Sequence, residues 1–224
     1  MALPDWQRPG PPPREPAVNL PPAVLALIGA NVAVHIVMSV LPYDAWEWVL
    51  AHLAFNPMRY SVDGLGGWPA WVAPVTYQFL HIGWIHLLLN MVMLSAFGSP
   101  LERGIGARRM LIIYVATGVA GAFTHGAFYP DAAAPVIGAS GSVSGLFGAV
   151  LWLMARPDRF GQRRMRFWPA ALIWIGISVL IGFVGMPVIA EGGGQIAWAA
   201  HVGGFALGIA MMAAMAAAAR RRGR

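Results

Sequence analysis

GASGSVSGLFG, residues 138–148, is the stretch of sequence that decides how this chain folds. It places three serines and four glycines in a chain of which 58% is hydrophobic and 11% is charged. Small residues that recur every four positions, such as Ser140, Ser144 and Gly148, form ridges that let helices approach closely in a membrane. So few charges cannot cover the surface of a soluble domain of 224 residues. We therefore predict an all-α membrane protein.

Six apolar stretches are long enough to cross a bilayer, which takes about 20 residues. They cover residues 23–42, 79–98, 110–128, 138–155, 168–186 and 196–219. The predicted fold is a bundle of six transmembrane helices within residues 23–219. Residues 1–22 hold too much proline for a helix, so we expect a disordered, Pro-rich cytoplasmic tail there, and a basic cytoplasmic tail at residues 220–224.

The arginines predict how the bundle is oriented. All 15 basic residues are Arg, and 14 of them lie in the two tails and in the segments 99–109 and 156–167, which six spans place on one side. The opposite connections hold Arg59 and five of the nine acidic residues; they are residues 43–78, 129–137 and 187–195. Because cytoplasmic loops are enriched in Arg, we expect a multi-pass protein of the cell (inner) membrane with both termini in the cytoplasm.

Two of the outer connections have a distinctive composition. Residues 43–78 carry four tryptophans, which favour the membrane interface, so this segment is expected to lie among the lipid headgroups. Residues 187–195 contain three successive glycines with little conformational restraint. We expect this segment to be a mobile cover over whatever lies below it.

Three predicted spans run in the same direction, and each brings polar side chains into the membrane near its outer end. His86 and Asn90 lie four residues apart on one face of the second span, Ser140 opens the fourth span, and His201 lies early in the sixth. On a continuous helix, His81 would point about 140° away from His86. Taken singly, each polar group could simply hydrogen-bond helices together. Four at one depth predict a shared polar pocket that opens outward, because polar groups in a membrane face the bundle interior.

The three serines of the opening stretch differ in their positions on the predicted helix. Ser142 lies about 200° around the helix from Ser140, and Ser144 lies one turn deeper. Ser140 alone sits in the first turn, where backbone N–H groups have no helical partner and the helix dipole favours negative charge. A serine hydroxyl needs a base, and His201 is the one base at that depth on an adjoining helix. These residues predict a Ser140/His201 catalytic dyad.

Other side chains complete the expected chemistry. His86 and Asn90 can donate hydrogen bonds to an oxyanion, together with the backbone N–H groups at Ser140 and Ala139. A zinc site is the competing chemistry, but the sequence has no HExxH motif and no carboxylate near the histidines, and it has no cysteine. We therefore expect no metal and no cofactor. The remaining histidines carry no motif and are expected to be structural or interfacial; they are His35, His52 and His125.

The chain resembles the rhomboid family of intramembrane serine proteases over residues 68–210. The motifs that carry the resemblance are TYQFLHIGWIHLLLNM (76–91), GASG (138–141) and AHVGGFALG (200–208). The resemblance implies a rhomboid-type bundle and the Ser140/His201 dyad, with His86, Asn90 and the Ser140 backbone as the oxyanion hole. It also implies substrates that are single-span membrane proteins. The sequence departs from the family at Ser144, where an aromatic residue often lies under the catalytic histidine.

The function that we predict is intramembrane serine endopeptidase, acting in or near the transmembrane segments of single-span proteins. Its expected partners are these substrates and the lipid bilayer; without a continuous basic face, no nucleic acid is expected. The alternative is a rhomboid-like protein that binds membrane clients without proteolysis. A small-solute transporter is a further possibility, although the spans lack central charges and broken helices.

Overall fold

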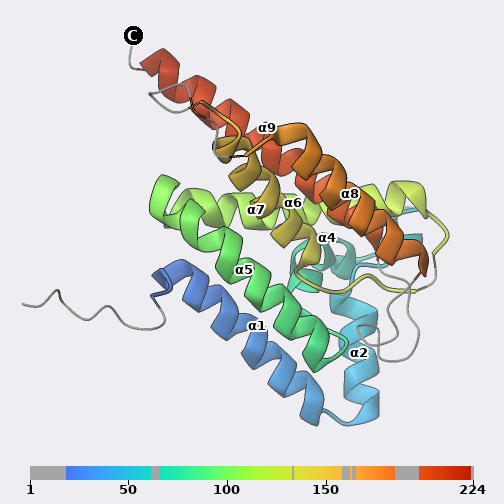
Figure 1. Cartoon of the computed structure of the whole chain (residues 1–224). Helices are drawn as coiled ribbons and strands as arrows, with labels where there is room; N and C mark the ends of the chain where they lie inside the picture. The colour runs from blue at the N-terminus through green and yellow to red at the C-terminus, as the bar shows by residue number, and fades with distance from the viewer. Residues whose placement is uncertain are drawn as a thin grey trace, which may run out of the picture.

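In the computed structural model, residues 19–61, 66–132, 134–157, 162, 165–184 and 197–222 are described, and they form a bundle of helices (Figure 1). The helices are α1 (Pro22–Val40), α2 (Tyr43–Leu53), α3 (Met58–Ser61), α4 (Trp68–Thr76), the 3-10 turn η2 (Tyr77–Phe79), α5 (Trp84–Ile105), α6 (Ala107–Phe128), α7 (Ser140–Met154), α8 (Phe167–Val184) and α9 (Trp198–Arg222). The prediction of an all-α membrane bundle is confirmed.

Helix α7 is the central element of the bundle. It contacts α5, α6, α8 and α9, and its most extensive contact is with α9. Ten of its 15 residues are buried. A central helix can be surrounded this closely only if its side chains are small, and α7 begins with the sequence SGSVSG. The small residues of the opening stretch therefore lie where the neighbouring helices converge.

The chain is a multi-pass membrane protein. Within the described residues, α1, α5, α6 and α9 are long and apolar enough to cross a membrane, while α7 and the Phe167–Leu180 part of α8 are shorter apolar helices. At 1.5 Å per residue, α7 is about 22 Å long, less than the roughly 30 Å of a bilayer's hydrocarbon layer. All six predicted spans coincide largely with one helix each; that all six cross the membrane stays a prediction.

Several helix boundaries differ from the expected spans: α5 continues to Ile105 and not to residue 98, and α6 begins at Ala107 and not at residue 110. Helix α5 begins at Trp84, not at residue 79, because Tyr77–Phe79 form a 3-10 turn and Gly83 is extended before the helix (φ −162°). Helix α9 continues through Arg222, past the predicted end at residue 219, since arginine is a good helix former. Residues 1–18 of the predicted tail and the predicted cover at 187–195 lie outside the described residues.

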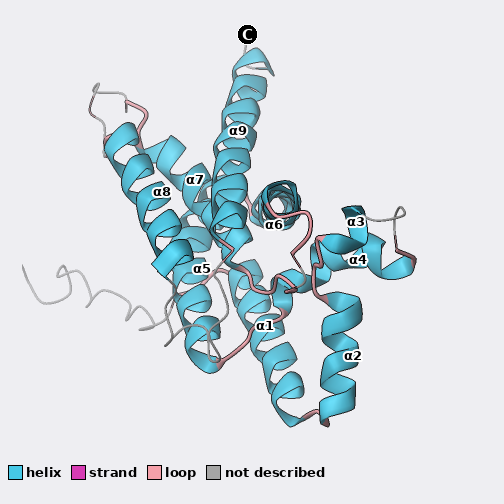
Figure 2. Ribbon diagram, turned by 90° about the vertical axis from the view of Figure 1, so that its right-hand side faces the viewer, coloured by secondary structure: helices cyan, strands magenta, loops and turns pink. Residues whose placement is uncertain are grey.

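The outer segment between α1 and α5 folds into short helices beside the bundle, with α2 roughly alongside α1 (Figure 2). Trp48, Trp68 and Trp71 are exposed there, as expected for rings at a membrane interface. The segment is tied to the chain that leads into α7, because Phe55 and Val136 exchange backbone hydrogen bonds of 3.1 and 2.7 Å.

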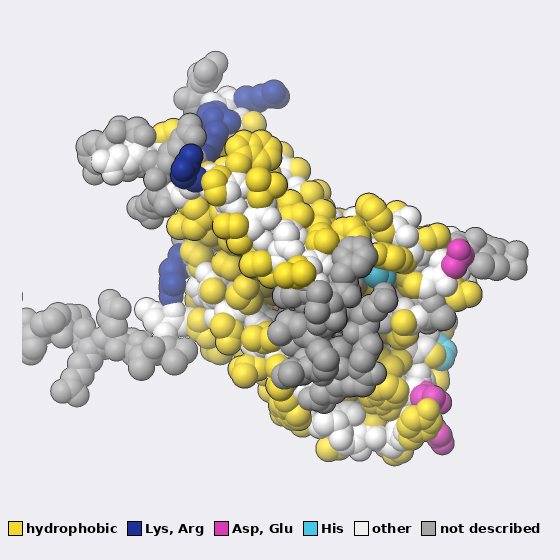
Figure 3. Space-filling view, turned by 45° about the vertical axis from the view of Figure 1, so that its right-hand side comes forward, with side chains coloured by type: hydrophobic (Ala, Val, Ile, Leu, Met, Phe, Trp, Pro, Cys, Tyr) yellow, Lys and Arg dark blue, Asp and Glu magenta, His cyan; other side chains and the backbone are white. Residues whose placement is uncertain are grey.

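Charges separate along the bundle. Figure 3 shows the visible arginines gathered mainly at one end of the molecule and the visible acidic side chains toward the other. Glu102, near the end of α5, is buried, and its carboxylate accepts hydrogen bonds from the backbone N–H groups of Ala23 (3.0 Å) and Val24 (2.9 Å). The carboxylate thus caps the N-terminus of α1, where the helix dipole favours a negative charge.

Candidate functional site

Ser140 is the first residue of α7, and its side chain is half-buried. Ala139 is the N-cap residue, and its carbonyl accepts the first intrahelical hydrogen bond, from the Val143 N–H at 2.9 Å. The N–H groups of Ser140, Gly141 and Ser142 precede that bond, so helix geometry leaves them without an intrahelical acceptor. The Ser140 hydroxyl therefore lies beside backbone donors at the positive end of a helix.

The approach to Ser140 depends on Gly138. Its φ of +118° is one that side-chain-bearing residues rarely adopt, and its N–H donates to the Tyr77 carbonyl at 2.9 Å. A Cβ at this position would lie 2.8 Å from Cε1 and 2.9 Å from Nε2 of His86. The missing side chain thus lets the His86 ring pack directly on the backbone two residues before Ser140.

Glycines bring α7 and α9 into backbone contact. A methyl group on Gly204 would overlap the carbonyl oxygen of Gly141, and one on Gly208 would overlap the carbonyl oxygen of Gly145. The two pairs are spaced by four residues on both helices, so the helices run parallel with a continuous line of contact. This agrees with the small-residue ridges that the sequence predicts.

His201 lies on the face of α9 that is in contact with α7. It precedes Gly204 by three residues and Gly208 by seven, and these spacings put all three on one side of a helix. The contact between Gly204 and Gly141 is one helical turn deeper than His201. His201 is half-buried, and helical side chains tilt toward the N-terminus, which favours a ring at the level of Ser140.

His86 and Asn90 approach this region from α5. The Asn90 side-chain amide donates to the His86 carbonyl at 2.9 Å, one turn back on the same helix, and Asn90 is 6% exposed. His86 is half-buried, and its ring lies against the backbone at Gly138. Side chains from α5, the start of α7 and α9 thus converge on one region.

His81 lies closer to His86 than the expected helix geometry allows. It precedes α5, so the 140° separation predicted for a continuous helix is wrong, and the two rings lie 5.1 Å apart in an edge-to-face arrangement. His81 Nε2 accepts a long hydrogen bond of 3.5 Å from the Ala139 N–H. This contact occupies the Ala139 N–H, one of the two backbone groups expected to be oxyanion donors. The other expected donor is the Ser140 N–H.

Ser142 has a partner of its own. Its hydroxyl donates to Gln78 Oε1 at 2.8 Å, and the Gln78 amide donates to the Pro74 carbonyl at 2.9 Å; Ser142 is fully buried. Beside it, the Tyr77 hydroxyl donates to the Gly118 carbonyl at 2.6 Å, and burial raises the pKa of this phenol, which keeps it protonated. The Ser142 hydroxyl therefore joins the outer segment to α7.

The structure also places two histidines that the sequence assigns no function. His35 on α1 is buried, and its ring meets the Trp84 ring edge to face at 4.5 Å. Trp84 precedes His86 by two residues on α5. His125 lies on α6 one turn after Gly121, where a Cβ would lie 2.7 Å from the carbonyl oxygen of Ala200. The signal that could have located His125 is its spacing from Gly118 and Gly121, which share its helix face.

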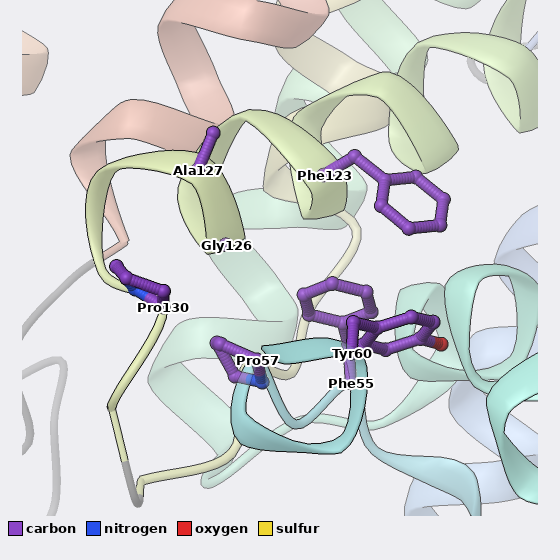
Figure 4. Close-up of a pocket in the computed structure, with 7 residues that line it drawn as sticks. All are labelled: Phe55, Pro57, Tyr60, Phe123, Gly126, Ala127 and Pro130. Carbon is purple, nitrogen blue, oxygen red and sulfur yellow. The ribbon is translucent and has the colours of Figure 1, made fainter. Parts of the chain in front are cut away.

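An apolar pocket of about 180 Å³ lies between α6 and the outer segment (Figure 4). Its lining residues are Phe55, Pro57, Tyr60, Phe123, Gly126, Ala127 and Pro130. The Tyr60 hydroxyl is the one titratable side-chain group among them, and it donates to the Ala70 carbonyl at 2.7 Å. The pocket therefore offers neither a nucleophile with a base nor an oxyanion donor.

Comparisons with known proteins match most of the chain. The model of the rhomboid domain family matches residues 69–218. The chain is 36% identical over 101 residues to the rhomboid protease GluP of Bacillus subtilis (strain 168), an alignment that covers 45% of this chain and 19% of GluP. It is 28% identical over 157 residues to the putative rhomboid protease YdcA of the same strain, covering 66% of this chain and 76% of YdcA.

A third relative covers more of the chain. The rhomboid protease GlpG of Pectobacterium atrosepticum is 27% identical over 196 residues, which are 85% of this chain and 61% of GlpG. The chain thus spans about a fifth of GluP, three quarters of YdcA and less than two thirds of GlpG. Among the residues that the structure describes, no three side chains of His, Cys, Asp or Glu are placed to share a metal ion.

Proposed function

The chain belongs to the rhomboid family, and on this premise we propose that it is an intramembrane serine endopeptidase with a Ser140/His201 dyad. Its substrates are single-span membrane proteins, which it cleaves in or near their transmembrane segments. The observation that carries the proposal is the position of His201 on the face of α9 that meets the start of α7, one turn outward of the contact between Gly204 and Gly141. That position is suited to a base beside Ser140.

In the proposed reaction, the Ser140 hydroxyl oxygen attacks the carbonyl carbon of the scissile peptide while His201 takes the hydroxyl proton. The oxyanion that forms accepts hydrogen bonds from the Ser140 N–H and from the side chains of His86 and Asn90. His201 then gives the proton to the leaving amine, which departs as the C–N bond breaks. A water molecule then attacks the acyl-enzyme while His201 takes one of its protons; as the ester C–O bond breaks, His201 returns that proton to the Ser140 oxygen and the product acid leaves.

The depth of the site supports substrates that reside in the membrane. Helix α7 is about 22 Å long, so its first residue can lie within the hydrocarbon layer when its last residue is at the cytoplasmic surface. Ser140 and His201 are nevertheless half-buried, not sealed, which leaves room for water and substrate to enter. A peptide bond in a locally unwound transmembrane segment fits such a site.

The charge distribution supports an orientation in the cell (inner) membrane with both termini in the cytoplasm. Exposed arginines lie at the turn between α5 and α6 and at the end of α9, whereas Asp44 and Glu47 lie on α2 at the opposite end. Arginine-rich ends face the cytoplasm. The site would then open toward the outer face, and cleavage would release outward-facing domains.

The test is cleavage of a single-span reporter protein in proteoliposomes by the wild type, Ser140→Ala and His201→Ala. We expect both variants to lose cleavage, because removing either member of a nucleophile–base pair typically costs several orders of magnitude in rate. A fluorophosphonate probe should label the wild type at Ser140 and leave Ser140→Ala unlabelled. Cleavage by Ser140→Ala at the wild-type rate would overturn the proposal, and reporter binding without cleavage would favour a client-binding protein.

A further inference from the structure

The proposed base raises the question of what holds its ring in place. A catalytic histidine works only when one ring nitrogen faces the nucleophile, and in a triad a carboxylate secures this by accepting a hydrogen bond from the other nitrogen. Within the described parts of helices α5 to α9, Glu102 is the one carboxylate, and both its oxygens are bound to the N-terminus of α1. Another group must orient His201.

His125 is placed to do so by the helix face on which it lies. Gly118, Gly121 and His125 follow each other at three and four residues, so they share one face of α6. A Cβ at Gly121 would lie 2.7 Å from the carbonyl oxygen of Ala200, the residue before His201. His125 lies one turn further along α6 than Gly121, on the face that meets the start of α9.

The ring of His125 is held but has a free nitrogen. It packs on the Tyr129 ring at 4.9 Å, and the Tyr129 hydroxyl accepts a hydrogen bond of 2.8 Å from Nε1 of Trp198, the first residue of α9. The end of α6 is thereby joined to the start of the helix that carries His201. His125 Nδ1 is buried and has no hydrogen-bond partner in the described structure. A buried nitrogen without a partner is costly unless it is used.

We propose that His125 is a positioning residue for His201: a ring nitrogen of His125 accepts a hydrogen bond, directly or through one water molecule, from the His201 nitrogen that faces away from Ser140. This inference rests on the proposed function. The hydrogen bond directs the other His201 nitrogen to the Ser140 hydroxyl and stabilises the imidazolium that forms when the hydroxyl proton is transferred. His125 thus takes the place of the missing carboxylate.

The experiment compares His125→Leu with His125→Asn, two side chains of similar size and branching of which only Asn carries an acceptor. Cleavage of the single-span reporter in proteoliposomes gives kcat and KM, and the rate of fluorophosphonate labelling reports activation of Ser140 without substrate. We expect His125→Leu to lower kcat and the labelling rate about tenfold with KM unchanged, the value of one hydrogen bond in the transition state. His125→Asn should recover most of that loss. His52→Leu, a histidine on α2 that stacks on Trp48, is the matched control and should match the wild type.

A purely structural role predicts a different order. If His125 only fills space, His125→Leu keeps the wild-type kcat and labelling rate, and His125→Asn has the lower values of the two variants. That result overturns the inference. If thermal unfolding shows that His125→Leu does not fold, His125→Phe, which also lacks an acceptor, replaces it with the same two outcomes. Failure of the proposed function is separate, since it appears as wild-type protein that is not labelled at Ser140.

Discussion

At the scale of single residues, the serines at 140, 142 and 144 carry the same hydroxyl and differ in their surroundings. Ser140 is half-buried at the helix start, Ser142 is bound to Gln78, and Ser144 is 1% exposed one turn deeper. Helix periodicity separates the three faces, and packing decides which hydroxyl remains available. The motif with three serines therefore contains one half-buried hydroxyl, the proposed nucleophile, and two buried ones.

Ser142→Ala should lower stability and leave the nucleophile intact. The substitution removes the donor to Gln78 Oε1 and leaves that buried oxygen unsatisfied, a loss of about 1–3 kcal/mol. We expect a lower midpoint of thermal unfolding in detergent, with labelling of Ser140 preserved at temperatures where the protein is folded. Ser95→Ala is the control, because its hydroxyl bonds only to the Met91 carbonyl of its own helix. Loss of labelling in folded Ser142→Ala would contradict this assignment.

At the scale of helices, the site depends on how closely α7 and α9 approach each other. Gly204 and Gly208 on α9 have no room for a methyl group against the carbonyls of Gly141 and Gly145. Since His201 is on the same face as these glycines, the separation of the helices sets the separation of the proposed base and nucleophile. Packing and chemistry are therefore encoded by the same few residues.

Gly204→Ala should push the two helices apart. The new methyl group overlaps the Gly141 carbonyl and lies 3.2 Å from the Thr117 carbonyl, so we expect lower thermal stability and loss of reporter cleavage by about 10²-fold or more. Gly176→Ala on α8 is the matched control, because a Cβ there meets nothing within 4 Å. It should keep full activity and gain slightly in stability. Equal behaviour of the two variants would count against this packing.

At the scale of the whole molecule, most of the described arginines and the exposed acidic side chains lie at opposite ends of the bundle (Figure 3). The arrangement gives the bundle one end suited to the cytoplasm and places the Ser140 end of α7 toward the other. The sequence contains no cysteine, so single cysteines introduced at chosen positions can report which end faces which side.

We predict that Arg220→Cys and Glu47→Cys label from opposite sides of the membrane. Both positions are exposed, on α9 and α2 respectively. In right-side-out vesicles, a maleimide that does not cross membranes should react with Glu47→Cys at once and with Arg220→Cys only after the vesicles are opened. Detergent-solubilised protein, in which both must react, controls for accessibility. The reverse pattern would invert the proposed topology.

Much of the architecture follows from local pattern. Length and apolarity predict each long helix, and four-residue spacing of small side chains predicts the contact between α7 and α9. The start of α5 could not be predicted this way. The apolar stretch that predicts the span begins at residue 79, inside the η2 turn, whereas the helix begins only after Gly83, which is extended. As a result, the prediction that His81 and His86 point about 140° apart on one helix is wrong.

By itself, the sequence determined the all-α membrane fold, the family and the positions of Ser140, His201, His86 and Asn90 as candidates, since periodicity and motif spacing act within one helix or in fixed order along the chain. The tertiary structure alone decided that His81 packs on His86, that Ser142 binds Gln78 and that Tyr129, beside His125, binds Trp198. The physical reason is that the last two hydrogen bonds join residues far apart in the chain, and that the contact of His81 with His86 depends on where α5 begins. Their geometry depends on how closely the glycine-lined helices approach, which no local pattern records.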